Sequence, residues 1–384
     1  MKTKRILSAV VSAALLFTSL FSTAGTGTIT ATAADVTTET LESSQLLDNL
    51  MDTATSFIVV KHYQLGGSHY AYTEYLNEVN GSGNANTNGP ELGYYKAGSQ
   101  LILVELEATR SGVEKTETVL IDSPNGMIRD PDVSMDGERV LFSWKQNATD
   151  DFHLYEAVIE DLRDDATDYR QLTFGSGDSQ TEPKYLPNGN IIFSCSKITQ
   201  TIDCWYVPVS NLYICGPDGE NMVRVGYDQV HTTYPTVTDD GRVLYTRWDY
   251  NDRNQMYIQG VFQMQADGTN QTEVYGNDPS GFVTSFLHTR AIPGTTDKYM
   301  TIGSGHHVRQ MGKLMIIDTS KGRNSIDAVD YVFPNDPGNQ SKTTINYDTF
   351  GQDGYVYKYP YPLNENEFLV AFATGRQGSN DLDT

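Results

Sequence analysis

Residues 128–144, IRDPDVSMDGERVLFSW, show most clearly how this chain folds. The stretch opens with a charged pair before a proline, reaches a tight turn at Asp136-Gly137 and continues into the apolar run 140–144. An Asp-Gly pair between two extended runs is a strong signal for a β-hairpin. We therefore expect two antiparallel strands that are joined at this turn.

The same pattern recurs along the chain at a regular distance. The segments 181–195 (TEPKYLPNGNIIFSC) and 233–248 (TYPTVTDDGRVLYTRW) each repeat it, and Pro131, Pro183 and Pro235 are spaced 52 residues apart. Two looser copies follow, with spacings of 56 and 69 residues, at Thr289-Arg290-Ala291 and at Lys358-Tyr359-Pro360. A fixed period of this length predicts a repeat architecture.

Each repeat contains two further extended segments. A third, alternating strand follows the apolar one at 153–159, 211–215, 261–265 and 313–318, and a more polar fourth strand closes the unit, as at 221–227. We find no helical periodicity in the mature chain. Four strands in each unit of 40–55 residues indicate the blades of an all-β propeller of four-stranded antiparallel blades. A sandwich or a two-sheet solenoid is the alternative.

The propeller domain is expected to span 57–384. Its first unit has candidate strands at 57–63, 69–73, 100–105 and 118–121, and residues 34–56 are interpreted as a linker with some helical tendency. The segment 368–373 is the second strand of a last blade that we expect to be truncated, so that the complete protein has about six blades. Alternatively, the N-terminal strands complete that blade.

The first 33 residues have the pattern of a signal peptide. Lys2, Lys4 and Arg5 precede an apolar stretch at 6–21, and Ala31-Thr32-Ala33 fits the small-residue cleavage pattern. We expect cleavage near Ala33, a secreted or extracellular protein, and no membrane span afterwards. The apolar stretch is short for a membrane anchor, which is the alternative.

The charge and the cysteines restrict the function further. Removal of the three positive charges in residues 1–33 changes the net charge from −22 to −25, which disfavours binding to nucleic acids. Three cysteines, Cys195, Cys204 and Cys215, permit at most one disulfide within the chain. A buried or loop-stapling role is favoured for them over metal binding, because no pair has the C-x₂-C spacing.

Two runs carry a resemblance to a known family. Residues 128–144 and 231–253 (HTTYPTVTDDGRVLYTRWDYNDR) resemble the propeller domain in the middle of hydrazine synthase alpha subunits, within the broader group of TolB-like six-bladed propellers. The resemblance covers roughly 57–384 and implies a propeller. It does not imply hydrazine chemistry, which depends on c-type haems, because the chain has no C-x-x-C-H motif for covalent haem attachment.

Propeller geometry predicts where a site would lie. The first strands of all blades begin, and the second strands end, on one face of the molecule. The candidate ligand-binding residues that we place there are Arg129, Asp130, Glu182, Tyr234, Arg247, Asp249 and Arg290. Aromatic residues in the same loops either stack on sugar rings or cap the ends of the blades; they are Trp205, Tyr206, Trp248 and Tyr250.

Four histidines on this face are candidate metal ligands: His231, His288, His306 and His307. Imidazoles from neighbouring blades, with Gln310, suit a divalent transition metal, and oligogalacturonate lyases use a His-rich site of this general kind. Otherwise the histidines make hydrogen bonds between blades.

No catalytic residue is assigned, since the sequence contains no G-x-S-x-G, phosphate-loop or H-E-x-x-H motif. We therefore expect a secreted module that binds a ligand or a partner, such as an extracellular glycan, peptide or protein. A metal-dependent lyase or hydrolase acting on an extracellular polysaccharide is the alternative. Redox or haem chemistry is least favoured.

Overall fold

The fold is described from a computed structural model. It covers residues 6–9, 35–42, 44–62, 97–202, 208–250, 258–277, 283–306, 310–333, 350–351 and 355–373. Apart from Ile6–Ala9, the expected signal peptide lies outside these residues. The expected strand at 69–73 also lies outside the described residues. The same holds for four residues named in the sequence analysis, which are Cys204, Trp205, Tyr206 and His307.

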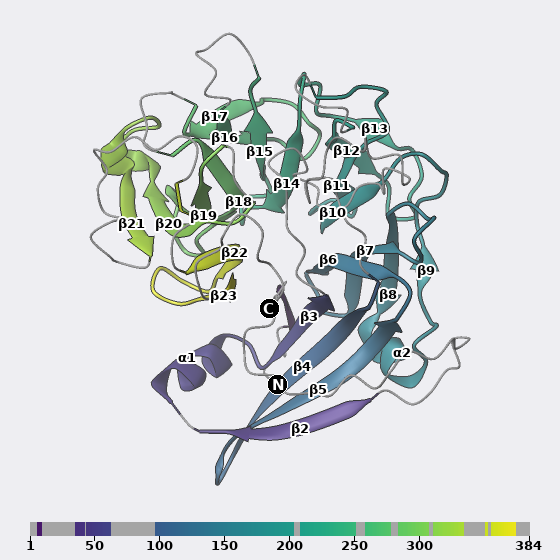
Figure 1. The fold of residues 1–384 in the computed structure, drawn as a ribbon. Helices are drawn as coiled ribbons and strands as arrows, with labels where there is room; N and C mark the ends of the chain where they lie inside the picture. Colours follow the sequence, from purple (N-terminus) through teal and green to yellow (C-terminus); the bar gives the residue numbers. More distant parts are fainter. Residues whose placement is uncertain are drawn as a thin grey trace, which may run out of the picture.

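Four blades of four antiparallel strands stand around a common centre (Figure 1), which confirms the propeller fold. The first two blades contain β6 (Met127–Val133), β7 (Arg139–Lys145), β8 (His153–Val158) and β9 (Arg170–Gln171), then β10 (Gln180–Tyr185), β11 (Ile191–Cys195), β12 (Asn211–Cys215) and β13 (Val223–Arg224). The next two contain β14 (Thr232–Val237), β15 (Val243–Trp248), β16 (Gln259–Met264) and β17 (Thr272–Tyr275), then β18 (Ser285–Ala291), β19 (Lys298–Ser304), β20 (Lys313–Asp318) and β21 (Val329–Phe333). The first strand of each blade lies innermost.

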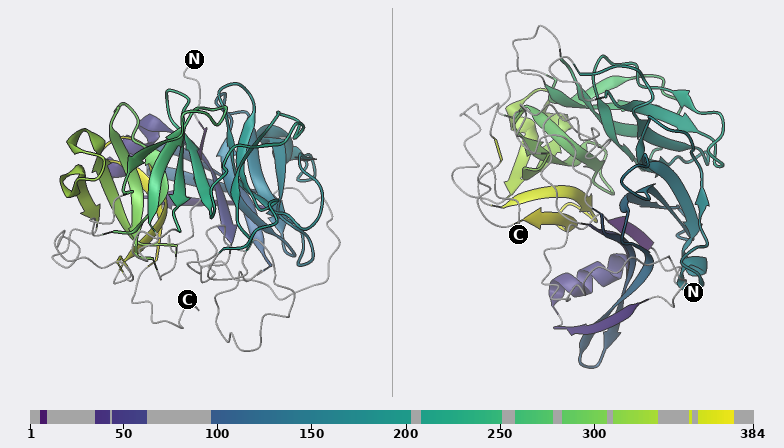
Figure 2. Two further views of the ribbon diagram at one scale, coloured as in Figure 1. Left: turned by 90° about the horizontal axis from the view of Figure 1, so that it is seen from above. Right: turned by 45° about the vertical axis from the view of Figure 1, so that its right-hand side comes forward.

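An N-terminal sheet precedes the blades and has the order β1-β3-β4-β5-β2. Its strands are β1 (Ile6–Ala9), β2 (Val36–Leu41), β3 (Ser56–His62), β4 (Ser99–Thr109) and β5 (Gly112–Ser123). The long β4–β5 hairpin extends beyond the ring of blades (Figures 1 and 2). Within the segment 34–56, expected as a linker with helical tendency, lie strand β2 and helix α1 (Gln45–Thr53). The Ser44 hydroxyl caps this helix by accepting the N–H of Leu47 at 3.2 Å.

Short helices interrupt the β pattern where the sequence shows no helical periodicity. Strand β8 ends at Val158, and the next residues form α2 (Ile159–Asp164). Two single-turn 3₁₀ helices, η1 (Thr319–Lys321) and η2 (Ile326–Ala328), connect β20 to β21. Helices of three to six residues are too short to show an apolar period of 3.6, and for this reason the sequence did not reveal them.

The core lies between neighbouring sheets. Trp144 contacts Tyr155 at 5.2 Å between ring centroids, and both pack with Ile58 and Leu101 of the N-terminal sheet.

Burial raises the pKa of the Cys195 and Cys215 thiols to about 12, so both are protonated at neutral pH. These two cysteines are therefore core residues rather than reactive thiols. No helix in the described part of the chain is both long and apolar enough to cross a membrane.

A two-stranded unit, β22 (Val356–Pro362) and β23 (Phe368–Ala373), lies between the fourth blade and the N-terminal sheet. Its contact with that sheet is made by side chains. Leu369 packs against the apolar cluster that includes Phe57 and Leu106, and the Asn49 amide of α1 donates to the Glu367 carboxylate. We call this junction the seam.

We predict that Phe193→Ala lowers the free energy of unfolding by about 3–5 kcal/mol, because the fully buried Phe193 ring fills the core between two blades. Phe174→Ala serves as the matched control, since its ring is 72% exposed and its loss should change stability by no more than about 0.5 kcal/mol. Urea unfolding of both variants measures the difference. Equal losses would contradict the described packing.

Candidate functional site in the central channel

Each innermost strand is interrupted in its middle by the same backbone irregularity. The pairing register shifts between Arg129 and Asp132 in β6, and at the corresponding points of β10, β14, β18 and β22. At each shift one non-glycine residue has a φ between 51° and 58°, in the left-handed region; these residues are Asp130, Glu182, Tyr234, His288 and Tyr359. Such conformations cost about 1–3 kcal/mol each and are concentrated at functional sites.

These five positions correct the alignment of the fourth repeat. The residue equivalent to Asp130 is His288. The sequence pattern, which matches Thr289-Arg290-Ala291 with Arg129-Asp130-Pro131, predicts Arg290 at this position. Arg290 instead occupies the position two residues later, which corresponds to Asp132 in β6 and Lys184 in β10. The fourth repeat has no proline to mark the bulge, so the sequence offered no anchor for the correct register.

Side chains of one blade bind the backbone of the next blade in the channel. Asp130 Oδ2 accepts a hydrogen bond from the Glu182 N–H at 3.1 Å, and Glu182 Oε2 accepts one from the Tyr234 N–H at 2.8 Å. Each bond joins residues 52 positions apart, so the sequence period is also a hydrogen-bonding period. These carboxylates satisfy backbone donors that the bulges remove from the strand ladder.

The first two blades form an acidic side of the channel. Arg129 Nε donates to Asp130 Oδ2 at 2.5 Å, and Arg129 Nη2 lies 3.8 Å from Glu182 Oε1. Burial, together with the neighbouring charge of Asp130, raises the pKa of Glu182 to about 7. Glu182 Oε2 also accepts from the Ser194 hydroxyl at 2.7 Å, whereas the buried Oε1 has no hydrogen-bond partner among the described residues.

The third and fourth blades and the β22–β23 unit contribute an aromatic side. The His288 ring lies between Tyr234 and Tyr359, with centroid distances of 3.9 and 4.4 Å. Burial, and then the positive charges of Lys358 and Arg129 among others, lowers the pKa of His288 well below its usual value, so the ring is neutral. Its buried Nε2 atom has no hydrogen-bond partner among the described residues.

A cavity of about 50 Å³ lies within this cluster. Four of the predicted ligand-binding residues (Asp130, Glu182, Tyr234 and Arg290) line it together with the predicted metal ligand His288. Lys184 and Tyr361 also line the cavity and are not among the residues expected from the sequence, although the 52-residue period that links Asp132 to Lys184 points to the first. The volume is well below the roughly 300–1,000 Å³ of pockets for drug-sized ligands, so a sugar ring does not fit.

Arg129 lies beside this cavity, but Arg247 and Asp249 do not line it. Arg247 Nε is 2.9 Å from both Asp228 Oδ1 and Asp249 Oδ1, and its guanidinium covers the Phe262 ring. Asp228 lies in the loop that leads from the second blade to the third. The pair with Asp228 therefore fastens this loop to the third blade, whereas the pair with Asp249 lies within the third blade.

The two other candidate metal ligands among the described residues lie beside Trp248. His231 and His306 are each 5.7 Å from the Trp248 ring between centroids, and all three side chains are buried. His231 Nδ1 accepts the N–H of Ser210 at 3.0 Å, a hydrogen bond between blades. Trp248 thus caps a blade and is not available to stack on a sugar. Among the described residues no three His, Cys, Asp or Glu side chains are grouped closely enough to hold a metal ion.

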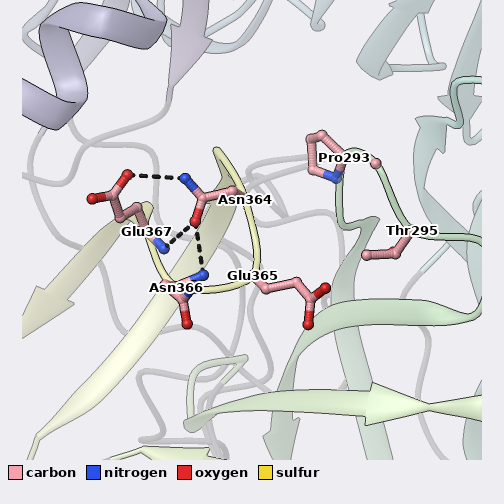
Figure 3. A pocket seen from close by; sticks show the side chains of 7 residues that line it. Pro293, Thr295, Asn364, Glu365, Asn366 and Glu367 are labelled. Atoms are coloured by element: carbon pink, nitrogen blue, oxygen red, sulfur yellow. Dashed lines mark hydrogen bonds between the residues drawn. The ribbon is translucent and has the colours of Figure 1, made fainter.

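A larger hollow of about 580 Å³ lies near the seam, between the β18–β19 and β22–β23 turns (Figure 3). Its polar groups largely bind one another. Asn364 Oδ1 accepts the N–H groups of Asn366 and Glu367 at 2.8 and 3.0 Å, and Lys298 pairs with Glu365. We therefore place the candidate site in the channel.

The raised pKa of Glu182 predicts a pH-dependent stability. The contribution of Glu182 is fully present below about pH 4.5 and is lost as the pH rises through about 7, because ionisation of this buried carboxyl is disfavoured in the folded state. The loss should be on the order of 3 kcal/mol.

Glu182→Gln should remove this pH dependence in urea unfolding measured from pH 4 to pH 8. The control is Asp164→Asn, which changes an exposed carboxylate. If the Glu182→Gln variant kept the wild-type pH profile, the assigned titration would be wrong.

No protein-family model matches the sequence, and no curated protein matches it. Among solved structures, Kuenenia stuttgartiensis hydrazine synthase superposes with a TM-score of 0.57 at 18% identity, over 83% of this chain and 42% of that chain. This chain thus spans less than half the length of the hydrazine synthase chain. A putative TolB from Agrobacterium tumefaciens gives a TM-score of 0.39 at 15% identity, over 59% of this chain and 74% of that chain.

An oligogalacturonate lyase in complex with manganese also gives 0.39, at 12% identity, over 72% of this chain and 71% of that chain. The last two similarities are too weak to support a conclusion, and the first, at 18% identity, shows a shared fold alone. The resemblance noted in the sequence is confirmed at that level: this chain is a β-propeller protein that shares its fold with part of hydrazine synthase.

Proposed function

We propose that this protein is a secreted binding module that recognises its partner through the face on which the innermost strands begin. We call this the strand-start face; it is marked by the first residues of the inner strands, Met127, Gln180, Thr232, Ser285 and Val356. The opposite face carries the hairpin turns between the first and second strands.

The observation that carries the proposal is the position of the exposed aromatic rings. Among the described residues, the exposed Phe, Tyr and Trp side chains are Phe174, Tyr227 and Tyr355. Phe174 and Tyr227 follow the fourth strands of two successive blades, and Tyr355 directly precedes β22. All three therefore lie on the strand-start face. Exposed aromatic rings are typical of binding surfaces, where they add contact area and stacking.

The net charge favours a neutral glycan as the partner. After signal cleavage the chain would carry −25, and this repels acidic polysaccharides as it repels nucleic acids. The ring of Tyr227 already has the Arg224 guanidinium 4.8 Å from its centroid, which holds the ring in place. The alternative of a metal-dependent lyase or hydrolase is favoured by no observation in the described residues.

We predict that the triple variant Phe174→Ala, Tyr227→Ala, Tyr355→Ala binds a neutral polysaccharide at least tenfold more weakly than the wild type, since stacking contributes about 0.5–1.5 kcal/mol for each ring. Affinity gel electrophoresis against a panel of neutral polysaccharides measures this. Met135→Ala is the control, because Met135 is 85% exposed at a turn on the opposite face. Retention of no polysaccharide, or equal retention of the triple variant, would contradict the proposal.

Secretion is a separate proposal, and it rests on the N-terminal sequence. When expressed with its first 33 residues, the protein should be recovered outside the cytoplasm with Ala34 as its first residue, as determined by mass spectrometry of the intact chain. A control with Leu15→Arg and Leu16→Arg, which break the apolar stretch, should remain uncleaved. Recovery of an uncleaved wild-type chain in the membrane fraction would favour the anchor instead.

A further inference from the structure

The channel cavity contains two buried polar atoms that have no hydrogen-bond partner among the described residues, Glu182 Oε1 and His288 Nε2. Both side chains are more than nine-tenths buried, and both line the same cavity. A buried polar group without a partner costs free energy, and a native protein that retains two of them in one cavity usually provides them with a bound molecule. This pair is independent of the strand-start face and its aromatic rings.

The hydrogen bonds around Glu182 determine which of its two oxygens carries the proton when the carboxyl group is neutral. Oε2 already accepts two hydrogen bonds, from the Tyr234 N–H at 2.8 Å and from the Ser194 hydroxyl at 2.7 Å. Because both lone pairs of Oε2 are in use, a proton on this carboxyl resides on Oε1. Protonated Glu182 therefore presents an O–H donor to the cavity. Neutral His288 presents a second donor when its ring proton is on Nε2.

The charges around the cavity select the sign of the ligand. Positive charge near His288 comes from Lys358, Arg129, Arg290 and Lys184, and negative charge near Glu182 comes from Asp130. Arg129 is paired with Asp130, and Lys184 with Asp132. The Arg290 guanidinium lies on the Tyr361 ring, 4.6 Å from its centroid, and lines the cavity. With Glu182 protonated and the other charges paired, Arg290 is the charged group of the lining that has no ion-pair partner among the described residues, and it favours an anion over a metal cation.

The volume limits the size of that anion. A single bound water molecule needs roughly 10–15 Å³ of cavity volume. The cavity of about 50 Å³ therefore holds roughly three to five non-hydrogen atoms.

We propose that the channel binds a small carboxylate of three or four non-hydrogen atoms, which accepts hydrogen bonds from Glu182 Oε1–H and His288 Nε2–H beside the Arg290 guanidinium.

Isothermal titration calorimetry of the mature chain with sodium formate, at pH 6 and pH 8 and constant ionic strength, tests this proposal. Binding requires protonated Glu182, and around a pKa of about 7 the protonated fraction falls roughly tenfold between these pH values. Formate should therefore bind about tenfold more tightly at pH 6. Sodium chloride in place of formate is the control for a general salt effect.

Three variants separate the contributions. Glu182→Gln keeps a donor at the position of Oε1, so it should bind formate equally at both pH values, with an affinity close to that of the wild type at pH 6. His288→Phe and Arg290→Gln should each weaken binding at least tenfold, and circular dichroism checks that they fold. Absence of formate binding by the wild type at both pH values would mean that the cavity holds water only. Persistence of the pH dependence in Glu182→Gln would also overturn the proposal.

Discussion

The structure depends on one strained residue in the middle of each innermost strand. A left-handed residue takes its own N–H out of the regular ladder and turns its side chain into the channel. In the first two blades the carboxylate of that residue accepts the N–H of the equivalent residue in the next blade, as Asp130 does for Glu182. The strain of one blade is thus compensated by its neighbour. The 52-residue spacing of the first three blades is thus also the spacing of these hydrogen bonds.

The sequence predicted the fold well because its signals are local. The Asp-Gly and Asn-Gly turns indicate the hairpins, and β11 and β15 end at Cys195 and Trp248, where the repeated segments 181–195 and 233–248 also end. The site was only partly predictable. Strand direction indicates at which end of a blade a residue lies, whereas entry of its side chain into the channel depends on the bulge, which shifts the alternation of the side chains. For this reason the sequence pattern places Arg247 with Glu182, although Arg247 pairs with Asp228 of the loop between two blades. It also places His288 with His231, which packs on Trp248.

Charge is distributed unevenly between the surface and the channel. The chain carries 49 acidic and 27 basic residues, yet four basic residues lie near enough to His288 in the channel to lower its pKa. Acidic side chains such as Asp164 and Asp165 remain hydrated at the surface, where they favour solubility. The basic groups of the channel are held by specific partners, for example Lys184 by Asp132 at 3.1 Å. The overall charge therefore describes what the surface repels and does not describe what the channel attracts.

The seam gives the ring an unequal resistance to opening. The first blades are joined through buried hydrogen bonds between side chains and backbone, whereas β23 meets the N-terminal sheet through Leu369 and through an amide–carboxylate contact at Glu367. A junction made of side chains separates at a lower cost in free energy than one that includes buried backbone hydrogen bonds. Among the described residues, the circle is therefore held less firmly at the seam than between its first blades.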